Sequence, residues 1–307
     1  NETLAIVGES GCGKSVTAMS ILGLVSKPGE IMEGSKIVYM GDVERGEEGV
    51  NLATASDAQI RDVRGNGISM IFQDPMTCLN PTMKVGKQLT ETLKKHKKIS
   101  REEEKAEAIK LLNMVQIPNA EERVNQYPHE FSGGMRQRAM IAMALACKPK
   151  LLIADEPTTA LDVTIQAQIM KLLAELGKET KTAVILITHD LGVVANLADR
   201  VSVMYAGKVV EEGTVSDIFY RYAHPYTEAL LKSLPTVDTK KDEQLVSIPG
   251  TPPDLYAPPQ GCAFASRCEK CMKICKKNQP PVFEVGEGHK ASCWRLHPDF
   301  PGKKEEN

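Results

Sequence analysis

The chain has 307 residues, of which 42% are hydrophobic and 25% are charged, and its net charge at pH 7 is −2. These values are those of an ordinary globular protein with room for more than one domain. The near-neutral charge gives no indication of a nucleic-acid surface, and no apolar run is long enough to cross a bilayer. No signal peptide is evident and residue 1 is Asn, so we expect a cytosolic protein whose sequence is truncated at its start.

A glycine-rich loop is the first element with recognisable chemistry. Leu4–Val7 is expected to be a buried strand, and the loop Gly8-Glu9-Ser10-Gly11-Cys12-Gly13-Lys14-Ser15 follows it, with a helix expected over Val16–Leu24. Such loops turn backbone N–H groups toward phosphate oxygens, with Lys on the β- and γ-phosphates and Ser on Mg²⁺. An ordinary strand-to-helix turn is the alternative. The nucleotide-binding residues predicted here are Gly8, Ser10, Gly11, Cys12, Gly13, Lys14, Ser15 and Val16.

The middle of the chain changes from a strand-rich to a helical character. Residues 35–72 are expected to be rich in strands, and residues from about 75 to 147 to be helical. Within the helical stretch, Ser100 with Glu103 forms a capping box ahead of an apolar helical face. A second helix is expected to begin at Ser132 and end at Cys147, before Lys148-Pro149.

Two adjacent carboxylates follow a buried strand. Leu151–Ala154 delivers Asp155 and Glu156 at the strand's C-terminal end, where open α/β sheets bind their ligands. Asp155 is expected to hold Mg²⁺, and Glu156 to polarise an attacking water. Alternatively, both cap the next helix, which is expected to begin near Val163 and end at Gly177.

The remaining elements complete an α/β pattern. A strand is expected at Thr182–Ile187, and Val201–Tyr205 with Lys208–Val210 suggests a hairpin. Strands that alternate with helices imply a parallel sheet, here with one helical insertion. Six prolines between residues 235 and 259 indicate a linker. A cysteine-rich stretch follows, which in a cytosolic protein suggests metal ligands before disulfides.

The run Phe131-Ser132-Gly133-Gly134-Met135 resembles the signature of ATP-binding subunits of ABC transporters, usually Leu-Ser-Gly-Gly-Gln, and departs from it at both ends. The resemblance implies an α/β P-loop NTPase core that binds ATP and Mg²⁺. It also implies that Ser132, Gly133 and Gly134 contact the γ-phosphate bound by the opposite subunit. Ser132 is also simply a good N-cap residue.

Three further positions match motifs of that family. Gln73 matches the glutamine that senses Mg²⁺ and the attacking water, Asp162 matches a loop that meets the partner subunit, and His189 matches a histidine that contacts the γ-phosphate. The resemblance therefore implies Glu156, His189 and Gln73 as catalytic residues, and Ser15, Gln73 and Asp155 as Mg²⁺ contacts. The family's adenine-stacking aromatic precedes the loop, and only seven residues precede Gly8 here, so it is not assigned.

The second half resembles the oligopeptide/dipeptide importer ATPases, with nickel importers close to them. The resemblance rests on Met135-Arg136-Gln137-Arg138, His224-Pro225-Tyr226-Thr227, Ile248-Pro249-Gly250 and the terminal cysteines. It implies an ATPase that works with a second, related ATPase, two transmembrane permease subunits and, indirectly, an extracytoplasmic binding protein. Its place would be the cytoplasmic face of a bacterial or archaeal membrane.

In that subfamily four C-terminal cysteines hold an iron–sulfur cluster. Cys262, Cys268, Cys275 and Cys293 match its spacing of five, six and seventeen intervening residues, and Cys271 is an extra thiol. Four thiolates suit a [4Fe–4S] cluster, which the resemblance favours, or zinc. The nearby cations Arg267, Lys270, Lys273, Lys276 and Lys277 would offset thiolate charge, or form an ordinary solvated surface.

The predicted organisation is an ABC ATPase domain over residues 1–234 that lacks its N-terminal strands, a linker over 235–261 and a small cysteine-rich module over 262–300. A DNA-repair ATPase is a rival interpretation, but that class carries very long coiled-coil or zinc insertions. Here the interval between Lys14 and Ser132 is 117 residues without sustained heptads. A translation or ribosome-recycling factor is a second rival interpretation, but that class usually fuses two cassettes in one chain.

Overall fold

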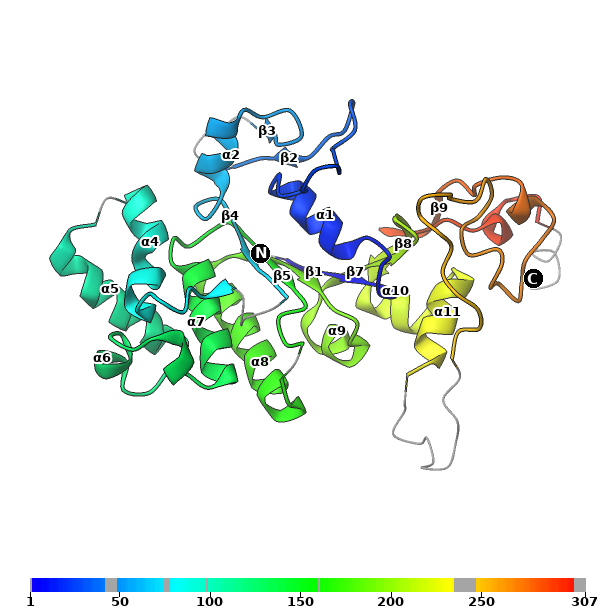
Figure 1. Cartoon of the computed structure of the whole chain (residues 1–307). Coiled ribbons are helices and arrows are strands. Elements are labelled where there is room, and N and C mark those ends of the chain that lie inside the picture. The colour runs from blue at the N-terminus through cyan, green and yellow to red at the C-terminus, as the bar shows by residue number, and fades with distance from the viewer. Residues whose placement is uncertain are drawn as a thin grey trace. The chain divides into compact units, whose positions relative to one another are not determined.

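The computed structural model describes residues 2–41, 49–73, 78–97, 99–159, 161–234 and 247–300 (Figure 1). The chain divides into a first unit, residues 15–187, and a second unit formed by Glu2–Lys14 and the chain from Thr188 onward. The first part of the predicted linker, residues 235–246, lies outside the described residues, as does the charged C-terminal tail. Each unit is described by itself below.

Three parallel strands run through the first unit. Strand β4 (Ile68–Ile71) pairs with β5 (Leu151–Asp155), which pairs with β6 (Ala183–Ile187). In β5 the residues from position 152 to 155 are all buried, as expected for a parallel strand covered on both faces. The predicted apolar strands and their parallel pairing are confirmed here.

The helical insertion of the first unit consists of α4 (Val85–Lys97), α5 (Arg101–Met114), α6 (Ala120–Arg123), a 3₁₀ turn at Pro128–Glu130 and α7 (Gly133–Leu145). These elements run from cyan to green in Figure 1. The capping box of Ser100 and Glu103 is present at the start of α5, as predicted. Both residues satisfy backbone N–H groups that a helix start otherwise leaves without partners.

The stretch before this insertion differs from its prediction. Among its described residues, those outside 42–48, it contains two short antiparallel strands besides β4, namely β2 (Val38–Tyr39) and β3 (Val50–Asn51). A helix, α2 (Asp57–Val63), occupies much of the rest, because Ser56 and Gln59 form a second capping box. Two further helices lie in this unit: α1 (Lys14–Ile21), whose first residue belongs to the second unit, and α8 (Val163–Thr180).

The sheet of the second unit is mixed. Strand β1 (Thr3–Val7) is parallel to β7 (Arg200–Tyr205), which forms the predicted hairpin with β8 (Lys208–Thr214). Antiparallel pairing continues from β8 to β10 (His289–Ala291) and from β10 to β9 (Phe283–Gly286). The prediction of a parallel sheet is therefore correct only in part.

The cysteine-rich stretch does not stand apart as a module of its own. Its strand β10 pairs with β8, and the Phe264 ring packs edge-on against the rings of Tyr205 and Tyr226. Those three aromatic side chains are buried in one hydrophobic core with residues of β1 and β7. The stretch also contains 3₁₀ turns at Ile274–Lys276 and Trp294–Leu296. A separate cysteine-rich module is therefore not supported.

The described residues of the second unit include the helices α9 (Leu191–Leu197), α10 (Val215–Tyr220) and α11 (Pro225–Lys232). His224 caps the start of α11, and its Nδ1 accepts a hydrogen bond from the Tyr226 N–H at 3.0 Å. In the part of the chain that the structure describes, no helix combines the length and the apolar character that a membrane crossing needs.

Candidate functional site

The glycine loop connects β1 to α1. At Gly8, whose φ is 152°, an added Cβ would lie 2.2 Å from the carbonyl oxygen of Met204, so a side chain has no room. Gly13 has a φ of 101°, which L-residues rarely adopt. The backbone conformation of the loop therefore depends on glycine at the positions that the phosphate-binding pattern requires.

Lys14 is buried against its own loop. Its Nζ donates hydrogen bonds to the carbonyl oxygens of Gly8 at 2.8 Å and Glu9 at 3.1 Å, and only 5% of the residue is exposed. Cys12 is also buried, and burial raises the pKa of its thiol. Ser10 and Gly11 are exposed at the tip of the loop, and Val16 is exposed on the first turn of α1.

The first unit brings Ser15 and Asp155 together. The Ser15 hydroxyl donates a hydrogen bond to Asp155 Oδ1 at 3.0 Å, and Asp155 is 4% exposed at the end of β5. Hydroxyl and carboxylate oxygens are the ligands that Mg²⁺ prefers. The two side chains therefore fit the predicted magnesium contact, although they lie 140 positions apart in the chain.

Glu156 and Gln73 also meet. Gln73 Nε2 donates to Glu156 Oε2 at 3.0 Å, and the Thr159 hydroxyl donates to the same oxygen at 2.9 Å. The φ of Glu156 is 45°, in the left-handed region, and its N–H donates to the carbonyl oxygen of Ile187. A non-glycine residue in this conformation is strained by on the order of 1 kcal/mol or more, which is typical of functional sites. Thr159 was missed by the motif search, although it lies only three residues beyond Glu156.

The signature residues and Asp162 begin two helices. Ser132 caps α7 by accepting from the Met135 N–H, and Asp162 caps α8 by accepting from the Ile165 N–H. The capping that was the alternative interpretation of Ser132 therefore occurs, whereas α8 is capped by Asp162 and not by Asp155 or Glu156. Ser132 and Gly133 are exposed, and a Cβ on Gly134 would lie 3.1 Å from Ile165 Cγ2. The start of α7 therefore presents backbone N–H groups and little side-chain bulk.

His189 lies two residues beyond β6 and is exposed. It belongs to the second unit, whereas Asp155, Glu156 and Gln73 belong to the first. Its predicted contact with a γ-phosphate stays a prediction.

The cysteines do not form a ready metal site. Among the described residues, no three His, Cys, Asp or Glu side chains are placed so that they could hold a metal ion. The prediction of a four-cysteine site is therefore not supported. The thiols nevertheless interact: burial raises the pKa of Cys268 to about 11, and repulsion from Cys293 and Cys262 adds to the shift. Burial also raises the pKa of Cys262 and of Cys293.

Arg267 is not part of a solvated basic surface around the thiols. Its side chain is 3% exposed and pairs with Glu9 of the glycine loop. The two residues are separated by 258 positions, and Glu9 stands at a variable position of the loop pattern. No motif could have indicated this contact.

Comparisons with known proteins define the class. A family model described as ABC transporter matches residues 1–159, and one described as oligopeptide/dipeptide transporter, C-terminal region, matches residues 210–275. A solved structure, the dimeric ATP-binding cassette MJ0796 in a post-hydrolysis state bound to ADP and Pi, matches with a TM-score of 0.56 at 28% identity, over 70% of this chain and 85% of that chain. The chain belongs to the ABC transporter family.

Individual relatives are more similar in sequence to this chain than the solved structure is. The chain is 59% identical, over 98% of its length and 82% of the relative's, to the oligopeptide transport ATP-binding protein OppD of Bacillus subtilis (strain 168). It is 54% identical to the dipeptide transport ATP-binding protein DppD of Lactococcus lactis subsp. cremoris, over 98% of this chain and 83% of that protein.

Proposed function

We propose that this protein is the ATP-hydrolysing subunit of an ABC importer for oligopeptides or dipeptides. The observation that carries the proposal is the pairing of Ser15 with Asp155 and of Gln73 with Glu156 in one unit, at the end of β5. The names of the relatives add the substrate class, since they refer to oligopeptide and dipeptide transport. None of the observations favours nickel.

The residues suit stepwise roles in hydrolysis. Lys14 would bind the β- and γ-phosphates in place of the Gly8 and Glu9 carbonyls, and Ser15 and Asp155 would hold Mg²⁺. When bound, Mg²⁺ neutralises charge that develops on the phosphate oxygens. Glu156 orients and polarises the attacking water, with Gln73 fixing the carboxylate in the required direction.

The exposed start of α7 suits an intermolecular role. Backbone N–H groups at a helix N-terminus bind anions, and Ser132, Gly133 and Gly134 leave them accessible. We infer that these residues contact ATP bound by a second ABC ATPase subunit and that Asp162 meets that subunit. For His189 we infer a contact with the γ-phosphate. The dimeric form of the MJ0796 cassette supports this inference. Two permease subunits would anchor the pair at the cytoplasmic face of the membrane.

A metal in the cysteine-rich stretch is a separate part of the proposal. The spacing of Cys262, Cys268, Cys275 and Cys293 supports four thiolate ligands for a [4Fe–4S] cluster, or for zinc. The described thiol positions would have to rearrange to bind it. Anaerobic purification followed by iron and zinc analysis tests this part alone; absence of both metals would refute it.

The main proposal is tested by affinity purification of the chain from membranes of its own organism. We expect two permeases and a second ATPase to accompany it, and ATP hydrolysis by the complex to rise when peptide and its binding protein are added. A complex whose hydrolysis responds to nickel instead of peptide would contradict the substrate class.

A further inference from the structure

Arg267 uses every hydrogen-bond donor of its side chain. Nη1 and Nη2 bind the two carboxylate oxygens of Glu9 at 2.6 and 2.9 Å, the bidentate geometry that suits a guanidinium. Nη1 also donates to the Tyr205 hydroxyl. The remaining donors go to the carbonyl oxygens of Ile248, from Nη2, and Pro249, from Nε. Five N–H groups thus have five acceptors, and none is left for a thiol.

Glu9 is held at three points by residues of the second unit. Arg267 binds its carboxylate, the Tyr226 hydroxyl accepts its backbone N–H at 2.9 Å, and its carbonyl oxygen accepts from Lys14 Nζ. Tyr226 is fully buried and lies in the same core as Tyr205. The C-terminal part of the chain therefore fixes both the backbone and the charge of a residue inside the glycine loop.

The Glu9 carboxylate carries a negative charge inside a loop that is expected to bind negatively charged phosphates. Glu9 directly follows Gly8 and its carbonyl oxygen contacts the lysine that is expected to bind the phosphates. A negative charge so close to a triphosphate opposes binding, and poor screening near a protein surface makes the repulsion substantial. The Arg267 guanidinium lies on that carboxylate and cancels its charge.

From this geometry we propose that Arg267 is a positioning residue for nucleotide binding: it neutralises Glu9 and holds the glycine loop in its phosphate-binding form. The inference rests on the proposed binding of ATP at this loop. It assigns a role in the ATPase cycle to the C-terminal part of the chain, because Arg267 stands directly before Cys268 and also holds the Ile248 and Pro249 carbonyls.

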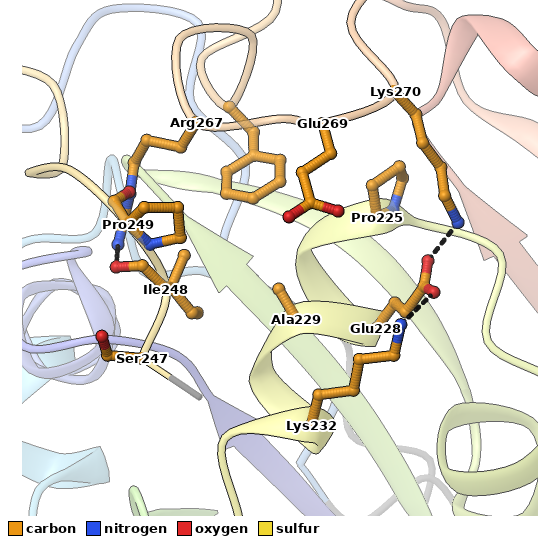
Figure 2. A pocket seen from close by; sticks show the side chains of 11 residues that line it. Pro225, Glu228, Ala229, Lys232, Ser247, Ile248, Pro249, Arg267, Glu269 and Lys270 are labelled. Atoms are coloured by element: carbon orange, nitrogen blue, oxygen red, sulfur yellow. Dashed lines mark hydrogen bonds and ion pairs between the residues drawn. The ribbon is translucent and has the colours of Figure 1, made fainter. Parts of the chain in front are cut away.

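The same part of the chain offers a matched control. Figure 2 shows Arg267 beside Ile248 and Pro249 on one side of a pocket, and Lys270 with Lys232 on Glu228 at the other. Lys270 is 41% exposed and its partner Glu228 has a second cation, Lys232, at 2.8 Å. Removal of the Lys270 charge therefore changes a solvated ion pair three residues from Arg267 without touching the loop.

The experiment measures ATP affinity of the full-length chain at low and high salt, for the wild type and for Arg267→Met, Glu9→Gln, the double variant and Lys270→Met. We expect Arg267→Met to weaken affinity roughly tenfold, more at low salt, because the exposed Glu9 charge then repels the nucleotide. Glu9→Gln is expected to tighten binding by a few fold, since Arg267 then adds a net positive charge. The ATP affinity of the double variant should return to within about threefold of the wild-type value. The control variant Lys270→Met should bind ATP as the wild type does.

If Arg267 compensates the charge of Glu9, Arg267→Met and Glu9→Gln should change ATP affinity in opposite directions. If the pair only supports the fold, both variants should weaken it. If both weaken binding and the double variant does not recover, the pair only supports the fold and the inference is wrong. If Arg267→Met does not fold, Arg267→Lys replaces it: retained charge should keep affinity within about threefold, and a loss as large as tenfold would refute the compensation. Should the wild type bind no ATP, the proposed function itself fails, whereas an unchanged affinity of Arg267→Met removes this inference alone.

Discussion

Two neighbourhoods of the molecule use carboxylates in opposite ways. At the end of β5, Glu156 is half-buried, has a strained backbone and is held by the exposed amide of Gln73. In the second unit, Glu211 is completely buried and accepts from the backbone N–H groups of Ala223 and His224 and pairs with His289. The first carboxylate remains accessible for chemistry, whereas the second is committed to holding β8, α11 and β10 together.

The two carboxylates differ in what their replacement is expected to change, namely turnover for Glu156 and stability for Glu211. An accessible carboxylate with flexible partners contributes little to stability, so its replacement should change turnover. A buried carboxylate with several donors is costly to remove, because the donors are left without partners in a low dielectric. Each prediction below tests one side of this contrast.

Glu156→Gln should have the largest effect. We expect turnover of ATP to fall by on the order of 10²–10⁴, with ATP still bound, because the amide cannot polarise water as a carboxylate does. Steady-state phosphate release and nucleotide binding measure the two steps. Glu175→Gln, on the exposed side of α8 (52% exposed), is the matched control and should leave both unchanged. Retention of full turnover by Glu156→Gln would remove Glu156 from the mechanism.

Glu211→Ala should lower the free energy of unfolding by about 3–5 kcal/mol, since it leaves His289 and two backbone N–H groups buried without their acceptor. Trp294 is the chain's single tryptophan and lies in the second unit, so its fluorescence during urea titration follows that unit. Glu212→Ala is the neighbouring control; its partner Arg200 is 40% exposed, and a loss under about 1 kcal/mol is expected. Equal losses for the two variants would contradict the contrast.

His224 should make the second unit sensitive to acid. Burial lowers the pKa of His224 from 6.5 to about 4. Between these values the unfolded chain binds a proton that the folded chain does not, so this contribution to stability is complete above pH 6.5 and is lost as pH falls toward 4. The contribution is about 3 kcal/mol.

His224→Asn, which keeps a side-chain acceptor at the start of α11, should remove most of this pH dependence. The same Trp294 signal, recorded at pH 4.5 and 7, checks it. His297, with 41% of its side chain accessible, provides the control substitution to Asn. A wild-type protein whose stability does not change over this range would refute the assignment of a neutral, buried imidazole.

Lys14→Ala should weaken ATP binding by roughly 10–100-fold through loss of a charge-assisted contact with phosphate. Little change in the fold is expected, because the lysine donates to groups of its own loop, namely the Gly8 and Glu9 carbonyl oxygens and the Cys12 sulfur. Lys171→Ala on α8, with a side chain 78% exposed, should bind ATP as the wild type does. Unchanged affinity of Lys14→Ala would show that the phosphates bind elsewhere.

The sequence was informative where the contacts are local. The glycine loop, the capping box at Ser100, the parallel strands around Asp155 and the hairpin of β7 and β8 follow from spacing and turn chemistry, which act over a few residues. The family resemblance assigned Ser15 and Asp155 to one Mg²⁺ ion and Gln73 and Glu156 to one attacking water. In the first unit each of these pairs is joined by a hydrogen bond.

The sequence was uninformative where the contacts are distant. Nothing near Arg267 indicates that its partner is Glu9, because only the tertiary fold brings them together. The addition of β10 to β8 likewise could not be expected from a stretch that lacks clear alternation, and the cysteines drew attention to metal chemistry instead. The α2 helix was missed because its strongest signal, the Ser56–Gln59 capping box, is short.

Reconstitution of the chain with its permeases and second ATPase in proteoliposomes tests the central assignment most directly. Uptake of labelled peptide should require ATP, the peptide-binding protein and Glu156, and hydrolysis should rise with peptide and stop in the Glu156→Gln complex. A complex that takes up peptide equally well with Glu156→Gln, or hydrolyses ATP without any response to peptide, would contradict it.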